Sequence, residues 1–129
     1  MSAIFKKGEV ITNDYFTGIA YLEMLVPEGT EYNCPIGNVT FEPGARNNWH
    51  THDGGQILLV TSGEGYYQEE GKPAQKLQAG DVITIPANLK HWHGATRDSE
   101  FVHLAITTNP QKGGTNWLEP VSDTQYNAL

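Results

Sequence analysis

The sequence predicts an all-β protein, either a sandwich or a barrel of short strands. Three features predict it: turn signals recur about every 8–12 residues, Gly (14) and Pro (7) are frequent, and helix signals are scarce. Apolar residues make up 38% of the chain, which is enough for one small β core. The 129 residues show no repeat, linker or low-complexity tract, so we expect residues 1–129 to form one domain.

The expected strands are apolar or alternating runs that end at turn residues. Val39 and Phe41 alternate with polar neighbours, and their run stops at Pro43-Gly44. The same signals predict strands at 19–26, 38–42, 47–52, 56–61, 82–86 and 101–107, with turns at 62–65 and 70–73. Ser122 and Gln125 have the spacing of a capping box, which predicts a short C-terminal helix at 123–128.

Charge and cysteine content limit the partners. The net charge is −7 and the pI is near 5.0, without a basic run, so we expect neither nucleic acid nor a membrane as partner. No stretch approaches the roughly 18 apolar residues of a membrane span, and none resembles a signal peptide. The single cysteine, Cys34, has no partner for an intrachain disulfide, and we expect it to be structural in a cytoplasmic protein.

Four of the five histidines form two His-x-His pairs, His50 with His52 and His91 with His93. Alternate residues of a strand project from the same face, so each pair presents two imidazoles side by side. Because neutral imidazole is the commonest side-chain metal ligand, the pairs predict a metal site. The fifth, His103, alternates with aliphatic residues in 101–107 and is expected to face the lumen with Phe101, Ala105 and Thr107.

Two spaced motifs contain these pairs. The first is Gly44-x5-His50-x-His52-x3-Gln56-x6-Gly63, and the second is Gly80-x5-Pro86-x-Asn88-x2-His91. In order and spacing they resemble the two conserved motifs of the cupin superfamily. The resemblance implies a double-stranded β-helix, the cupin or jelly-roll barrel, which holds one divalent metal ion on His50, His52, Gln56 and His91. The sequence departs from the family pattern at Gln56 (Glu in the family), Asn88 (Gly) and Ala95 (Asn).

Gln56 matters most among these departures, because it changes the charge of the expected site. Three imidazoles and one amide are neutral, so the ion would keep its full charge, act as a stronger Lewis acid and favour an anionic ligand. The lost carboxylate also weakens metal affinity, and a vestigial, empty site is the alternative. Nitrogen and oxygen ligands with open positions admit Mn, Fe, Zn, Ni or Co.

Further strings extend the resemblance along most of the chain. The sequence is similar to small bacterial monocupins described as cupin-type hydroxynitrile lyases, at residues 16–18, 39–46, 49–52, 91–95 and 103–106. That resemblance implies Gln as fourth ligand, manganese as the most typical metal, and His93 and His103 as active-site residues that do not bind it. It also implies a homodimer or homotetramer, which the apolar strand 19–26 favours if it lies at a sheet edge.

Three functions are compatible with these features. The first is a metal-dependent lyase for a small hydroxy or carbonyl compound, such as a cyanohydrin, with a Lewis-acid metal and His93 or His103 as general base. The second is an Fe- or Mn-dependent oxygenase for a small aromatic or oxygenated substrate, although a neutral ligand set stabilises high oxidation states poorly. The third is a non-catalytic ligand-binding cupin, which the two extra histidines disfavour.

Arg46, Trp49 and Trp92 are further candidates next to the motifs. Arg46 suits either of two roles, holding a substrate anion or bracing a turn, and the second is favoured. Trp49 and Trp92 are expected to be packing residues rather than to stack on a substrate, because their neighbours face the other way.

Overall fold

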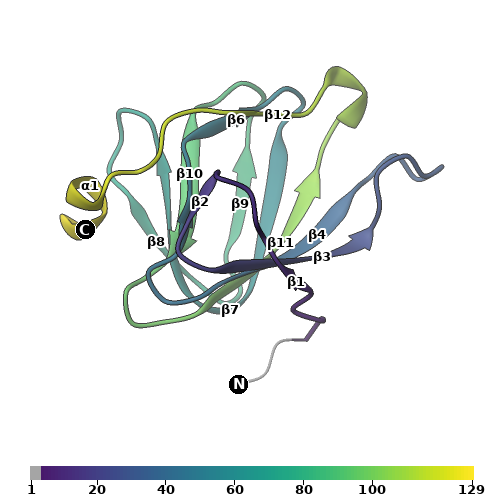
Figure 1. Ribbon diagram of the computed structural model, residues 1–129. Helices are drawn as coiled ribbons and strands as arrows, with labels where there is room; N and C mark the ends of the chain where they lie inside the picture. The colour runs from purple at the N-terminus through teal and green to yellow at the C-terminus, as the bar shows by residue number, and fades with distance from the viewer. Residues whose placement is uncertain (1–3) are drawn as a thin grey trace.

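The computed structural model describes residues 4–129, which form an antiparallel sheet curled into a barrel (Figure 1). Two short helical pieces lie in the C-terminal part: a 3-10 helix, η1 (Pro110–Lys112), and α1 (Asp123–Asn127). Among the described residues, no helix is long and apolar enough to cross a membrane. The strands are β1 (Glu9–Val10), β2 (Phe16–Thr17), β3 (Ala20–Val26), β4 (Ile36–Phe41), β5 (Arg46–Asn47), β6 (His50–His52), β7 (Gln56–Glu69), β8 (Gln75–Gln78), β9 (Val82–Ile85), β10 (His91–Ala95), β11 (Phe101–Thr107) and β12 (Thr115–Trp117).

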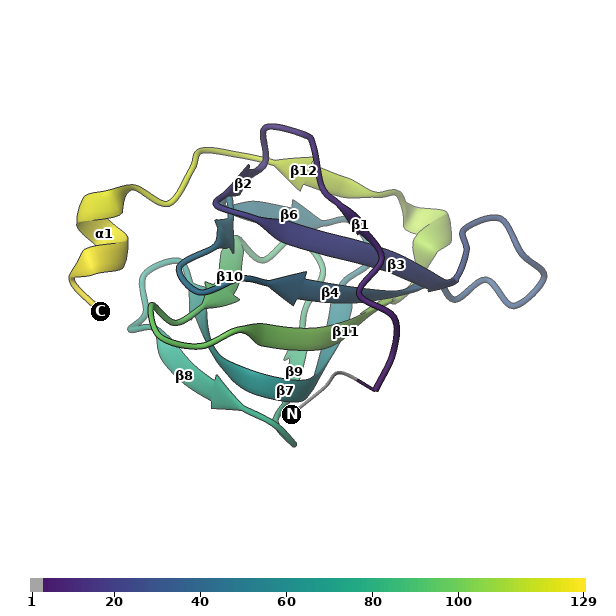
Figure 2. The same cartoon turned by 60° about the horizontal axis from the view of Figure 1, so that its bottom comes forward.

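The long strand β7 joins the two faces of the barrel. Its first half pairs with β11 and β9, and its second half pairs with β10 and β8. Beyond β11 the sheet continues through β4 and β3 to β1, which Figure 2 shows as neighbouring strands. Beyond β10 it continues to β5 and β2 on one path and to β6 and β12 on another. Every pairing is antiparallel, and the curled sheet is the expected jelly-roll barrel.

The tight turn predicted at 62–65 is wrong, because these residues lie inside β7. Gly63 has a φ of 77°, and the register of β7 against β11 shifts between Val102 and His103. A Cβ atom at Gly63 would lie 1.7 Å from the carbonyl oxygen of Glu100. The shift leaves Thr61 as the extra residue of a β-bulge, two residues before Gly63, where the strand passes from one face of the barrel to the other.

The other elements agree with the sequence more closely. The strand expected at 47–52 is divided into β5 and β6, while the strands expected at 19–26, 38–42, 82–86 and 101–107 match β3, β4, β9 and β11 within two residues. The C-terminal helix ends at Asn127 and begins with the expected capping box of Ser122 and Gln125. Asn88 has a φ of 66°, a left-handed conformation that Asn tolerates better than most residues.

Two apolar clusters stabilise the barrel. The larger includes the fully buried Phe41, Leu58 and Phe101 and fills one part of the interior. The smaller packs the C-terminal segment against the outside of β10 and consists of Trp49, Trp92, Val121 and Tyr126. The indole nitrogen of Trp92 donates to the side-chain oxygen of Gln68 at 2.8 Å. Both tryptophans therefore have the packing role that the sequence predicts.

Arg46 has the bracing role that the sequence favours, but it braces the C-terminal segment rather than a turn. Its Nη2 donates to the carbonyl oxygen of Val121 at 2.9 Å and to Asp123 Oδ1 at 2.7 Å. The guanidinium also lies 4.5 Å from the centre of the Tyr126 ring, and the hydroxyl of Tyr126 donates to the carbonyl of Ala95. The side chain is therefore occupied on the outer side of β5, away from the cavity described below.

Candidate metal centre

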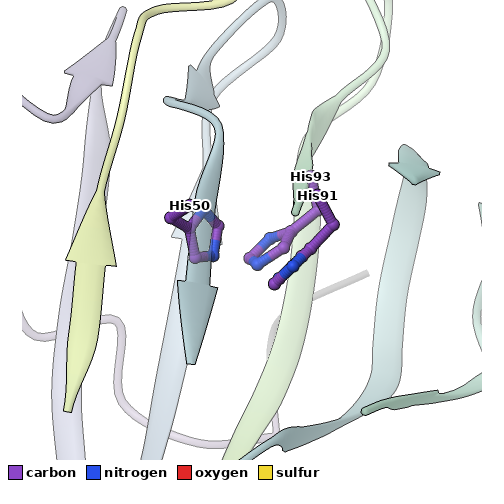
Figure 3. A group of neighbouring side chains, drawn as sticks. All are labelled: His50, His91 and His93. Atoms are coloured by element: carbon purple, nitrogen blue, oxygen red, sulfur yellow. The ribbon is translucent and has the colours of Figure 1, made fainter. Parts of the chain in front are cut away.

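Two paired strands place four histidines together. His50 and His52 lie on β6, and His91 and His93 lie on β10, with His91 opposite His50 in the antiparallel register. The ring centroids of His50 and His91 are 4.2 Å apart, and that of His52 lies 4.9 Å from His50. The nitrogens of His50, His91 and His93 lie within 4.8 Å of one another and face each other between the strands (Figure 3). This histidine triad is able to hold a metal ion.

A cavity of about 180 Å³ lies inside the barrel next to these strands. The polar part of its wall consists of His50, His52, Gln56, His93, His103, Asn47, Glu28 and two threonines. The apolar part includes Phe16, Leu22, Met24, Val39, Phe41 and Trp117. His91 is fully buried and is not part of the wall. The cavity thus has a histidine-rich pole and an apolar pole.

Backbone carbonyls fix the protonation of two of the imidazoles. His50 Nδ1 lies 2.7 Å from the carbonyl oxygen of Asn48, and His91 Nδ1 lies 2.9 Å from that of Leu89. A carbonyl oxygen only accepts hydrogen bonds, so both Nδ1 atoms carry the proton. In the neutral imidazole, Nε2 then keeps its lone pair, which is the form that binds a metal.

Three of the predicted ligand atoms are buried without a hydrogen-bond partner: Nε2 of His52, Nε2 of His91 and Oε1 of Gln56. Buried polar atoms are normally paired, so neighbouring lone-pair atoms without a hydrogen-bond partner indicate that a partner is missing. All three are neutral nitrogen or oxygen donors of the kind that divalent transition metals accept. The residues present therefore fit a metal ion.

His93 has a different environment, created by Asn47 on β5. The backbone N–H of His93 donates to Asn47 Oδ1 at 2.9 Å, which turns Nδ2 of the amide toward the His93 ring. Nδ2 lies 3.2 Å from Nε2 and 3.4 Å from Nδ1. The amide nitrogen only donates, so a lone pair of His93 is already engaged. The sequence carries no signal for Asn47, because its contact depends on how β5 lies against β10.

His103 on β11 lies beside His93, with the ring centroids 4.8 Å apart. It is fully buried, and neither of its ring nitrogens has a hydrogen-bond partner. Ala105 and Thr107 share its face and line the cavity, whereas Phe101 lies in the core cluster. His93 and His103 thus form a pair of imidazoles in the cavity wall.

Burial lowers the pKa of every histidine in the cluster, because desolvation disfavours the charged ring. It is the largest cause for each, and it lowers the pKa of His103 to about 4. The pKa of His52 is also lowered to about 4, first by burial and then by the charge of His91. The pKa values of His50 and His93 lie well below the usual value for the same reason. The imidazoles are therefore neutral near pH 7, as metal binding requires.

Comparisons with known proteins agree with this geometry. Residues 37–107 match the family described as Cupin domain. The chain is 41% identical over 113 residues to (R)-mandelonitrile lyase from Granulicella tundricola. This alignment covers 88% of this chain and 86% of that protein. It is 32% identical over 65 residues to acireductone dioxygenase 1 from Pectobacterium atrosepticum, covering 48% of this chain and 38% of that protein. The crystal structure of a cupin-like protein from Thermotoga maritima is 48% identical, superposes with a TM-score of 0.95, and covers 98% of this chain and 96% of that chain.

Proposed function

The chain belongs to the cupin family, and from that premise we propose that it is a metal-dependent lyase that cleaves or forms cyanohydrins. The observation that carries the proposal is the set of neutral, buried and unpartnered donors, Nε2 of His52, Nε2 of His91 and Oε1 of Gln56, beside a small cavity. The similarity to (R)-mandelonitrile lyase supports this reaction class. Enzymes of other classes share the fold, so the site and its chemistry must be tested directly.

The proposed metal ion is manganese, with Fe, Zn, Ni or Co as alternatives, and the proposed ligands are His50, His52, Gln56 and His91. His93 also belongs to the close group of nitrogens, but the amide of Asn47 faces its ring. His52 is better suited than His93 to bind the ion, because its Nδ1 contacts Thr115 while its Nε2 is buried and unpaired. We therefore assign His52 to the ion and leave His93 free for another role.

A bound divalent ion supplies positive charge at the histidine pole, which favours the ionised form of a nearby hydroxyl group. His93 or His103 accepts the proton of the cyanohydrin hydroxyl as general base. The C–CN bond then breaks, and its electron pair leaves with cyanide as the carbonyl group of the aldehyde forms. Because burial disfavours a charged imidazole, the same histidine returns its proton to cyanide, and the products are aldehyde and HCN.

The apolar pole of the cavity is suited to the organic part of a small, uncharged substrate. Phe16, Phe41 and Trp117 supply aromatic surface, and Leu22 and Met24 supply flexible aliphatic surface. Lys and Arg are absent from the residues that line this cavity, so a carboxylate substrate would find no side-chain counterion there. Size also limits the substrate, since the cavity holds only about 180 Å³.

Purified protein is expected to contain one metal ion per chain and to release benzaldehyde from mandelonitrile. Elemental analysis and an absorbance assay measure the two quantities, and smaller aliphatic cyanohydrins test the range of substrates. Removal of the metal with a chelator should abolish the activity, and added Mn²⁺ should restore it. The control is the His50→Ala/His52→Ala double variant at the same total metal concentration. Aldehyde release no faster than in this control would contradict the proposal.

An oxygenase is the second candidate, because part of the chain is similar to acireductone dioxygenases. An oxygen electrode applied to the same Fe²⁺- and Mn²⁺-loaded samples distinguishes the two reactions. Oxygen uptake with small aromatic or oxygenated compounds, together with no aldehyde release from cyanohydrins, would favour the oxygenase. Ligand binding without either reaction would favour the non-catalytic alternative.

We also propose that the chain forms a homodimer or homotetramer. The sheet ends at β1, where Val10 is exposed, and Leu22 and Met24 on the neighbouring β3, which line the cavity, are also partly exposed. An exposed apolar edge favours pairing with a second copy, which removes it from water. Light scattering at micromolar concentration is expected to give at least twice the chain mass of 14.2 kDa. A monomeric mass under those conditions would contradict this proposal.

A further inference from the structure

The C-terminal strand β12 lies across β6, outside residues 37–107 that match the cupin domain. Its register places Thr115 opposite His52 and Trp117 opposite His50. Directly opposed residues of an antiparallel pair project to the same face, so both side chains lie beside the histidine cluster. Thr115 and Trp117 also line the cavity. A segment far from the two histidine motifs thus contributes to the same site.

Thr115 contacts the one proposed histidine ligand that has no backbone partner. Its Oγ1 lies 3.1 Å from Nδ1 of His52. The corresponding atoms of His50 and His91 contact carbonyl oxygens two residues earlier in the chain, so those contacts come with the local backbone. The contact of His52, by contrast, exists only because β12 reaches β6 from 63 residues away.

Trp117, the last residue of β12, packs against His50, the other histidine of β6. Its ring centroid lies 4.7 Å from that of His50, and it stacks on Tyr15 at 4.8 Å with an interplanar angle of 5°. Phe16 packs against the same indole with centroids 5.8 Å apart. These contacts hold Trp117 against His50 and limit the directions in which Thr115 and the rest of β12 can move.

Hydrogen bonds on both sides hold β12 in this register. The side chain of Asn116 donates to Asp53 Oδ1 at 2.8 Å and to Thr51 Oγ1 at 3.2 Å. Just before the strand, a Cβ atom at Gly113 would lie 2.1 Å from a carboxylate oxygen of Asp53, so only glycine passes there without displacement. Beyond the strand, the Arg46 contacts described above secure the segment. The position of Thr115 is therefore built into the fold rather than incidental.

We propose that Thr115 is a positioning residue that prepares His52 to bind the metal ion. The Thr115 hydroxyl accepts a hydrogen bond from Nδ1–H of His52, which leaves the lone pair on Nε2 and fixes the orientation of the ring. The inference rests on the metal site of the proposed function and adds β12 to it. Partners of this kind typically change metal affinity by about 10–100-fold when they are removed.

The test compares Thr115→Val, which keeps the shape and removes the hydroxyl, with Thr115→Ser, which keeps the hydroxyl. Thr84→Val is the matched control, because it removes an exposed hydroxyl from β9 (Val82–Ile85) and leaves β6 and β12 unchanged. The dissociation constant of Mn²⁺ is measured by electron paramagnetic resonance, and the visible spectrum of the Co²⁺ form reports its coordination. The melting temperature of metal-free protein is measured for each variant.

Thr115→Val is expected to weaken Mn²⁺ binding by about 10–100-fold and to alter the Co²⁺ spectrum, with little change in the metal-free melting temperature. Thr115→Ser and Thr84→Val should bind as the wild type does. Equal affinity of Thr115→Val and wild type, or equally weak binding by Thr115→Ser, would overturn the inference. Mn²⁺ binding by the wild type and its loss in His50→Ala/His52→Ala test the underlying site separately. Should Thr115→Val fail to fold, Thr115→Ala takes its place against the same serine variant.

Discussion

Single replacement of His50, His52 or His91 by Ala is expected to remove the metal from the purified protein. Each change deletes one of three strong nitrogen donors, and the remaining amide oxygen of Gln56 is too weak a donor to compensate. Elemental analysis after dialysis against metal-free buffer measures the loss. His93→Ala is the matched control, because it removes a neighbouring imidazole whose ring already faces the Asn47 amide.

Gln56 variants should produce graded effects at the same site. Gln56→Ala is expected to weaken metal binding less than the histidine changes do. Gln56→Glu should tighten binding, because a carboxylate restores a negative charge, and it should blunt the Lewis acidity of the ion. Two outcomes would contradict the ligand assignment: metal retained in the His50→Ala/His52→Ala variant, or metal lost from His93→Ala as completely as from His52→Ala.

The sequence predicts the histidine pairs well because local rules determine their placement. Alternation along β6 and β10 places His50 with His52 and His91 with His93. Glycine or proline residues mark the ends of the segments that contain these pairs. The regular spacing of these turn residues also predicts the short strands that form the barrel. The error at 62–65 has a local cause, since a glycine with positive φ occurs in a bent strand next to a β-bulge as well as in a turn, and only the pairing of β7 with β11 distinguishes them.

Residues that contact the histidines from other strands could not be predicted from alternation and turn residues. Asn47 meets His93 only when β5 lies beside β10, and Thr115 meets His52 only when β12 crosses β6. Both contacts depend on register between segments that are distant in the sequence, and neither residue belongs to a spaced motif. The sequence favours a bracing role for Arg46 but does not identify its partners, because these lie in the C-terminal segment.

Replacing His93 or His103 by Ala is expected to leave the metal content nearly intact and to lower kcat on a cyanohydrin by about 10²-fold or more, the usual contribution of a general base. Both imidazoles line the cavity and lie outside the proposed ligand set. His103 has no hydrogen-bond partner on either nitrogen, whereas His93 has the Asn47 amide against its ring. The larger loss is therefore expected for His103→Ala. Turnover is measured on fully metallated protein, per folded molecule.

The competing explanation is that both histidines only fill the barrel, and it makes a different prediction. Removing a buried side chain would then lower the melting temperature without lowering kcat of the folded fraction. His103→Gln separates the two, because glutamine keeps polar atoms and much of the volume but cannot accept a proton near neutral pH. A general base predicts that His103→Gln is as inactive as His103→Ala although its melting temperature is closer to that of the wild type. Unchanged kcat in both alanine variants would remove His93 and His103 from the mechanism and leave the metal centre as the sole catalytic element.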